Sequence, residues 1–104
     1  MVRVVVITTT FASQEQAAPV LRKLVEERLV ACAHLNRISS HYRWESNVVC
    51  EEEWRASLKT SSAVCDAAIS RLCDLHPYEV PMILSREEDA SEEYGAWVVA
   101  ETER

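Results

Sequence analysis

The chain has 104 residues, a formal net charge of −6 and a single glycine, Gly95. This length predicts one domain over residues 1–104, and the acidic balance excludes nucleic acid as the main partner, because neutralising phosphates requires clustered lysine and arginine. A single glycine also excludes the glycine-rich loops that bind dinucleotides and nucleotide phosphates, so we expect no organic cofactor.

The apolar runs of the sequence are all shorter than the roughly twenty residues of a membrane span. Residues 1–10 lack the features of a signal peptide. The four cysteines, Cys32, Cys50, Cys65 and Cys73, form no C-x-x-C pair and are too few for a disulfide scaffold. We therefore expect a reduced, cytoplasmic protein without a membrane partner, in which Cys50, Cys65 and Cys73 pack in the core.

The beginning of the chain predicts a strand followed by a helix. β-Branched residues dominate residues 2–10, which is typical of a central strand buried on both faces. Ser13 and Gln16 have the spacing of a capping box. Apolar residues then recur at helical spacing over residues 17–29, and we expect Pro19 to bend or weaken the first turns of this helix.

Residues 30–43 and 48–60 predict two long strands joined by a turn at residues 44–47. Both arms exceed the usual length of a strand, so this hairpin should extend beyond the rest of the sheet. An overhanging edge with aromatic residues promotes aggregation unless another surface covers it. We therefore expect self-association in which each hairpin lies against a neighbouring chain; the alternative is a hairpin that folds back over its own sheet.

The second arm of the hairpin has the period-two pattern of a strand with one buried face. Cys50 and Trp54 lie on the face that we expect to be buried. Glu51 and Glu53 share the other face with Arg55, which predicts ordinary cross-strand ion pairs.

The second half of the chain continues with a helix capped within residues 60–62, and then reads His-Pro-Tyr-Glu-Val-Pro at residues 76–81. The two prolines fix φ and remove backbone donors, which predicts a stiff, extended bridge. A strand over residues 82–85 and a helix capped by Ser91 follow. The order β-α-β-β-α-β with an extra C-terminal helix predicts an α+β, ferredoxin-like sandwich.

This fold class does not by itself define a function. RNA-binding versions stack bases on aromatic residues of the sheet, but residues 2–10 contain no aromatic residue. Metallochaperone versions carry a C-x-x-C motif in the first loop, where residues 8–12 read Thr-Thr-Thr-Phe-Ala. No motif with an ordered nucleophile and base stands out, so we do not expect an enzyme.

Six segments along the chain form a more specific pattern: VVVITTT, LVEERLVACAHL, SSHYRWE, EEEWRASLKT, LHPYEVP and EYGAWV. In this order, and at nearly this spacing, they resemble the CutA family of divalent-cation tolerance proteins. The resemblance implies a homotrimer of ferredoxin-like subunits with long hairpins wrapped between neighbours, in agreement with the overhang. The family usually has Pro-Gly where this chain has Asn36-Arg37, so we expect the usual kink in the second strand to be made otherwise.

Four residues are candidate metal ligands. Cys32 and His34 leave the same face of a strand, and a thiolate and an imidazole suit copper or zinc. His76 and Glu79 on the bridge add further donors, and the resemblance implies that Cys32 and His76 bind a divalent cation, Cu²⁺ first. The ligand spacing of a closed tetrahedral site is missing, so any site should be open, weak or shared between subunits. Each of the first three has a structural alternative: a buried thiol, a polar interface residue and a histidine at a helix end.

A second hypothesis concerns small-molecule binding. CutA trimers resemble the PII regulators, whose trimers bind small anionic effectors in clefts between subunits. On this hypothesis Lys59, Arg43, Trp44, His76 and Tyr78 line a lateral cleft and metal binding is incidental. The metal hypothesis requires Cys32 and His76 to converge, whereas this one requires basic side chains to converge on an open cleft.

Overall fold

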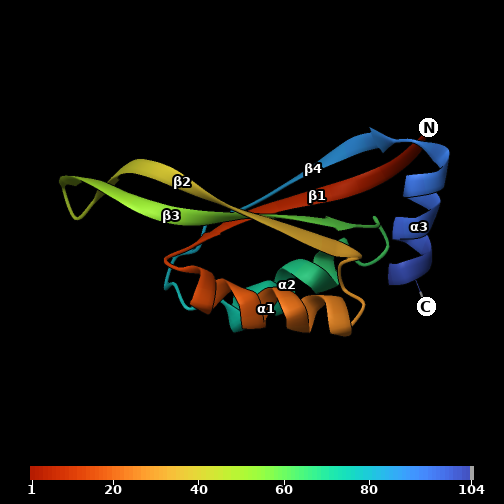
Figure 1. Ribbon diagram of the computed structural model, residues 1–104, viewed down its shortest axis with the longest axis horizontal. Helices are drawn as coiled ribbons and strands as arrows, with labels where there is room; N and C mark the ends of the chain where they lie inside the picture. Colours follow the sequence, from red (N-terminus) through yellow and green to blue (C-terminus); the bar gives the residue numbers. More distant parts are fainter. Residues whose placement is uncertain (104) are drawn as a thin grey trace.

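The computed structural model describes residues 1–103, which form a four-stranded antiparallel sheet and three helices (Figure 1). The strand order is β2-β3-β1-β4, which is the ferredoxin-like arrangement predicted from the order of elements. In chain order the elements are β1 (Val2–Phe11), α1 (Gln14–Glu26), β2 (Cys32–Trp44), β3 (Asn47–Thr60), α2 (Cys65–Leu75), β4 (Ile83–Ala90) and α3 (Glu92–Thr102).

The central strand β1 pairs with β3 on one side and β4 on the other. Because it is covered on both faces, it needs apolar side chains on both, and Val4, Val5, Val6 and Ile7 are all buried. Helices α1 and α2 cover one face of the sheet and enclose the main core (Figure 1). The prediction of a central, doubly buried first strand is confirmed.

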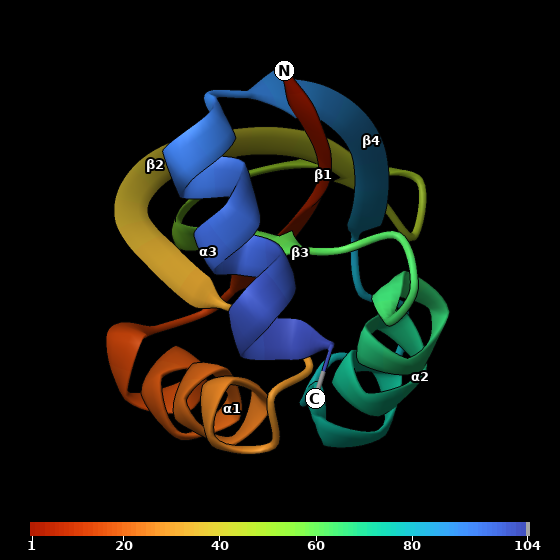
Figure 2. The ribbon, with the colours of Figure 1, turned by 90° about the vertical axis from the view of Figure 1, so that its right-hand side faces the viewer.

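Helix α3 packs at the end of the sheet away from the hairpin tip (Figures 1 and 2). Val98 of α3 joins Val4 and Ala31 in a second, smaller cluster of buried side chains. A Cβ atom on Gly95 would lie 2.4 Å from the Cβ of Val2, so the one glycine of the chain permits the helix to approach β1 closely.

The start of α1 follows the predicted cap. Ser13 is the N-cap, and its Oγ accepts a hydrogen bond of 3.1 Å from the backbone N–H of Gln16. The buried side chains of this helix are Ala17, Val20, Leu21 and Leu24. Pro19 lies within the helix, which continues to Glu26.

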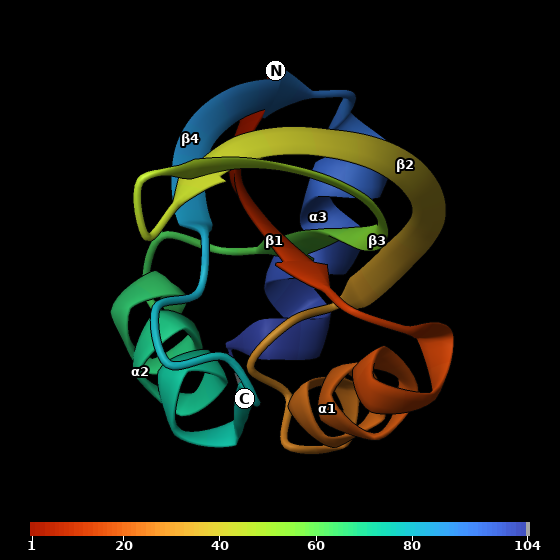
Figure 3. The ribbon, with the colours of Figure 1, turned by 90° about the vertical axis from the view of Figure 1, so that its left-hand side faces the viewer.

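The hairpin of β2 and β3 is longer than the sheet that supports it. β3 pairs with β1 only from Trp54 to Thr60, whereas the pairing of β2 with β3 continues to Trp44 and Asn47 (Figures 1 and 3). Glu45 and Ser46 both have positive φ, as the two-residue turn that suits a twisted hairpin requires. The predicted overhang is therefore present.

β2 continues through Asn36 and Arg37, which pair with Arg55 and Trp54. The expected kink is thus replaced by a smooth curvature, and Figure 2 shows β2 as a curved ribbon.

Two predicted boundaries were wrong. Helix α2 begins at Cys65 without a side-chain cap, because the hydroxyls that were expected to cap it make tertiary contacts. The Thr60 hydroxyl donates to the Leu29 carbonyl at 2.7 Å, and the Ser61 hydroxyl accepts from Thr102 at 3.0 Å. β4 extends to Ala90 instead of residue 85, since its charged second half pairs along the edge of β1.

Candidate functional site

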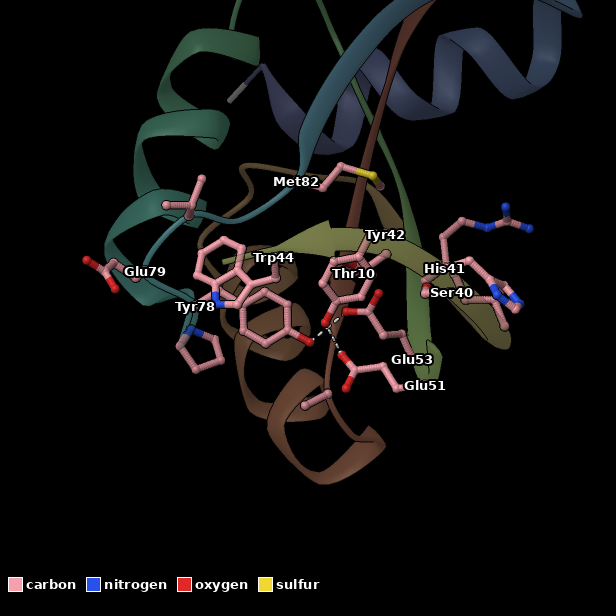
Figure 4. Close-up of a pocket in the computed structure, with 15 residues that line it drawn as sticks. Thr10, Ser40, His41, Tyr42, Trp44, Glu51, Glu53, Tyr78, Glu79 and Met82 are labelled. Atoms are coloured by element: carbon pink, nitrogen blue, oxygen red, sulfur yellow. Dashed lines mark hydrogen bonds between the residues drawn. The ribbon is translucent and has the colours of Figure 1, made fainter. Parts of the chain in front are cut away.

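A cavity of about 780 Å³ lies between the overhanging hairpin and residues 76–81 of the bridge. Its walls combine aromatic and acidic side chains, namely Tyr42, Trp44, Tyr78, Glu51, Glu53 and Glu79 (Figure 4). Arg55 and His41 also line it, together with apolar residues of the bridge. The cavity exists because the hairpin extends past β1 and the two prolines hold the bridge opposite it.

Two tyrosine–carboxylate pairs meet in this cavity (Figure 4). The Tyr78 hydroxyl donates to Glu53 Oε2 at 2.7 Å, and the Tyr42 hydroxyl donates to Glu51 Oε1. Burial and the bond to Glu53 raise the pKa of Tyr78, and the bond to Glu51 raises the pKa of Tyr42 to about 12. Both phenols therefore stay protonated and act as donors at neutral pH.

The expected ion pairs of Glu51 and Glu53 were a wrong prediction. Within residues 1–103, neither carboxylate forms a salt bridge, and Glu53 is only 7% exposed. Tyrosine hydroxyls take the place of the arginine that was expected to pair with the two glutamates. Tyr78 comes from the bridge and reaches over β3 to Glu53, and strand alternation alone does not reveal this contact.

His76 is held by hydrogen bonds and ring contacts and is 8% exposed. Its Nε2–H donates to the Thr10 carbonyl at 2.8 Å, and its Nδ1 accepts from the Tyr78 backbone N–H at 3.1 Å. The ring stacks on Phe11 with a centroid distance of 4.5 Å, and the backbone N–H donates to the Leu72 carbonyl. Burial lowers the pKa of this imidazole, so the neutral form is favoured.

This geometry leaves His76 without a free ring nitrogen in the single chain, and metal binding by His76 stays a prediction. A neutral imidazole has one lone pair on a ring nitrogen, and here that lone pair accepts the Tyr78 N–H. The structural alternative is the role that the contacts support: His76 fixes the start of the bridge against Phe11 and the end of β1.

Cys32 and His34 lie at the other end of β2, beside an ammonium group. The Lys59 Nζ donates to His34 Nδ1 at 3.1 Å and to Ser57 Oγ at 2.8 Å. Cys32 pairs with Lys59 across the strands, and its Sγ lies 3.2 Å from the Tyr94 hydroxyl. A positive charge at this position repels a dication, so the pair is poorly placed for a metal within one chain.

The predicted ligands do not converge within one chain. Glu79 lines the cavity, whereas Cys32 lies beside Tyr94 of α3 and His34 lies beside Lys59 of β3. Among residues 1–103, no three histidine, cysteine, aspartate or glutamate side chains gather closely enough to hold a metal ion. A site shared between subunits stays a prediction.

The predicted effector cleft is only partly assembled. Trp44 and Tyr78 line the same cavity, but Lys59 and Arg43 do not, and His76 is covered. Sequence reasoning missed Tyr42, Glu51 and Glu53 as cavity residues. Their alternation along the hairpin was the signal that could have placed them on one face.

The prediction of core packing is supported for Cys65, which packs against the main core, but was wrong for Cys50 and Cys73. Cys50 and Cys73 are exposed, whereas Cys32 and Cys65 are partly buried. Cys50 lies on the overhang, where no helix covers the strand, and Cys73 faces away from the buried stripe of α2. Periodicity identifies a face of a strand but does not show whether anything packs on that face.

Comparison with known proteins agrees with this architecture. Residues 5–101 match the family model of the CutA1 divalent ion tolerance protein. The chain belongs to the CutA1 family. The divalent-cation tolerance protein CutA of Pyrococcus horikoshii is 36% identical to it over 101 residues, which cover 96% of this chain and 99% of the relative.

Solved CutA structures share the fold closely. CutA1 from Pyrococcus horikoshii superimposes with a TM-score of 0.92 at 35% identity, covering 96% of this chain and 99% of the other. A CutA from Nostoc, described as PII-like, has a TM-score of 0.88 at 34% identity, with 94% and 96% covered. Within residues 1–103, no helix combines the length and apolar character that crossing a membrane requires.

The buried imidazole predicts a pH-dependent stability. Below its ordinary pKa of about 6.5, His76 takes up a proton more readily in the unfolded chain than in the folded one. The free energy of unfolding should therefore fall as the pH decreases from about 8 to about 5.5. Denaturant unfolding at fixed chain concentration measures this slope. The dependence of the free energy of unfolding on pH should be weaker in His76→Gln and unchanged in the control His41→Gln, whose histidine is exposed. Equal pH dependence in wild type and His76→Gln would contradict the prediction.

The Tyr78–Glu53 bond predicts an asymmetric effect of removing phenol hydroxyls. Tyr78→Phe leaves a buried carboxylate without its donor and should lower the free energy of unfolding by about 1–3 kcal/mol. Tyr42→Phe is the matched control, because Glu51 is exposed and water can replace the lost hydroxyl. Urea unfolding of both variants measures the two changes in the free energy of unfolding. Equal decreases in the two variants would show that the burial of Glu53 does not determine the effect.

Proposed function

We propose that this chain binds divalent cations, Cu²⁺ before others, as a homotrimer that contributes to tolerance of metal ions. The observation that carries the proposal is the family match, which spans residues 5–101. The Pyrococcus horikoshii relative, named a divalent-cation tolerance protein, aligns along almost its whole length. The exposed thiols of Cys50 and Cys73 and the exposed imidazole of His41 are donors of the type that copper prefers.

The absence of a group of three ligands within residues 1–103 bears on the kind of site. A closed tetrahedral site in one chain does not fit these residues. An open site, with water or a neighbouring chain in the remaining positions, does fit them, because donors such as Cys50 are exposed. Such a site suits a protein that binds metal reversibly.

Uncovered strand edges and exposed apolar side chains support the proposed trimer. β2 and β4 are the outer strands of the sheet, so each presents unpaired backbone groups. Trp44 and Val48 are exposed near the hairpin tip, and Met82 and Leu84 are exposed on or beside β4. A hairpin that packs against the sheet of the next chain covers both regions by one repeated contact.

A second candidate is a PII-like protein that binds a small effector, and the cavity of about 780 Å³ favours it. Its lining contains three glutamates but a single arginine, Arg55, so negative charges outnumber the permanent positive charge. Trp44 and two tyrosines add aromatic faces. Carboxylates and aromatic faces attract cations, so an organic cation fits this cavity better than the anionic effector expected from the sequence.

We further propose a cytoplasmic location and a role in binding without catalysis. Free thiols at exposed positions suit a reducing compartment. One relative of known structure, from Archaeoglobus fulgidus, is described as periplasmic, so location is a property to be measured for each member.

Metal titration tests the main proposal. Isothermal titration of the reduced, full chain with Zn²⁺ and Cu²⁺ should give saturable binding at a simple ratio per subunit. Mg²⁺ should not compete, because thiol and imidazole donors discriminate against it. Weak, unsaturable heats for every cation would contradict metal binding and favour the effector candidate.

Sedimentation tests the assembly. At micromolar concentration the protein should sediment with three times the chain mass of 11.8 kDa. Leu84→Asp places a charge on the exposed apolar edge and should shift the population toward monomer, while the control Ser70→Asp on the exposed face of α2 should not. A wild-type chain that sediments as a folded monomer would overturn the proposed trimer.

A further inference from the structure

Cys50 and His41 form a thiol–imidazole pair on the overhanging hairpin. They are direct partners in the pairing of β2 with β3, and Cys50 Sγ lies 3.0 Å from His41 Nδ1. Both residues are exposed. Among residues 1–103, this is the only hydrogen bond between a thiol and an imidazole.

Cys50 lies on the hairpin face opposite Glu51 and Glu53, while its partner His41 also contributes to the lining of the cavity. Strand alternation places Cys50 and Glu51 on different faces, and the His41 ring points away from the two cavity glutamates in Figure 4. The hairpin therefore carries two groups of donors, which are the carboxylate and phenol oxygens of the cavity and the sulfur–nitrogen pair of Cys50 and His41.

The other two histidines of the chain are already engaged. Both ring nitrogens of His76 are hydrogen-bonded inside the fold, and the Nδ1 of His34 accepts from the Lys59 ammonium. His41 differs, because the partner of its Nδ1 is a thiol that is itself a metal ligand once deprotonated.

We propose that Cys50 Sγ and His41 Nδ1 are the metal-binding pair of this chain, for borderline cations such as Cu²⁺ and Zn²⁺. This inference rests on the proposed metal-binding function and names the donors for it. The metal replaces the proton shared between sulfur and nitrogen: Sγ and Nδ1 each bind the cation, one proton leaves to solvent, and Nε2 keeps its hydrogen. No electron is transferred in this step.

The geometry requires little movement. With metal–sulfur and metal–nitrogen bonds of roughly 2.3 and 2.0 Å at a tetrahedral angle, sulfur and nitrogen lie roughly 3.5 Å apart. The present separation is 3.0 Å, and rotation of two exposed side chains can widen it. The paired strands hold the Cα atoms in register, so the pair is preorganised without a helix or loop.

The neighbours on the same face make the site open and moderate in affinity. Glu52 is two residues from Cys50 and pairs loosely with Arg37, with 3.7 Å between their charged atoms. Arg43 is two residues from His41, toward the hairpin tip, and its positive charge disfavours the binding of a cation. Water, Glu52 or a neighbouring chain completes the coordination.

Cobalt provides a direct readout, because a thiolate bound to Co²⁺ gives a near-ultraviolet charge-transfer band. The reduced, full chain should develop this band on titration with Co²⁺ and lose it when Zn²⁺ is added. Cys50→Ser should abolish the band, and His41→Gln should weaken Co²⁺ and Zn²⁺ binding by about tenfold or more. Cys73→Ser is the matched control, because Cys73 is also exposed but has no imidazole beside it, and its band and affinity should match wild type.

The outcomes separate this assignment from the proposed function. Saturable binding that Cys50→Ser and His41→Gln leave unchanged, with loss in Cys32→Ser instead, overturns the Cys50–His41 site and keeps the metal-binding function. No saturable binding of Co²⁺, Zn²⁺ or Cu²⁺ by wild type overturns both. Loss in Cys50→Ser and His41→Gln alone supports both.

Discussion

The difference in length between β1 and the hairpin determines how the rest of the molecule is arranged. β1 supports β3 only from Trp54 to Thr60, so residues 47–53 have β2 as their strand neighbour within the described chain. The overhang has no helix beneath it, and its side chains are available to solvent, to the bridge and to other chains. The cavity, the exposed Cys50 and the uncovered apolar tip all follow from this constraint.

The bridge at residues 76–81 turns the overhang into a defined site. His76 anchors it to Phe11 and the Thr10 carbonyl, and Tyr78 then reaches Glu53. Because His76 is buried and both of its ring nitrogens are hydrogen-bonded, it holds the bridge rigidly against the end of β1. The exposed Cys50 and His41, by contrast, lie on the overhanging strands of the hairpin.

Hydrogen bonds from phenols, instead of ion pairs, set the character of the cavity. A tyrosine hydroxyl satisfies a carboxylate oxygen without cancelling its charge, so Glu51 and Glu53 keep their attraction for cations. The same hairpin also carries the hydrogen-bonded Cys50 thiol and His41 imidazole. One hairpin thus carries two groups of polar side chains that differ in chemistry.

Local patterns in the sequence were sufficient for the elements and their order. The β-branched run of β1, the Ser13 cap and the alternation of the hairpin act over a few residues, and family motifs extended them to the CutA fold. Contacts between distant residues were decided by the tertiary structure. His76 meets Thr10 across 66 residues of sequence, Ser61 bonds Thr102 instead of capping α2, and Cys50 is exposed because nothing packs on the overhang. Periodicity specifies which side chains share a face, but only the packed structure decides what lies against that face.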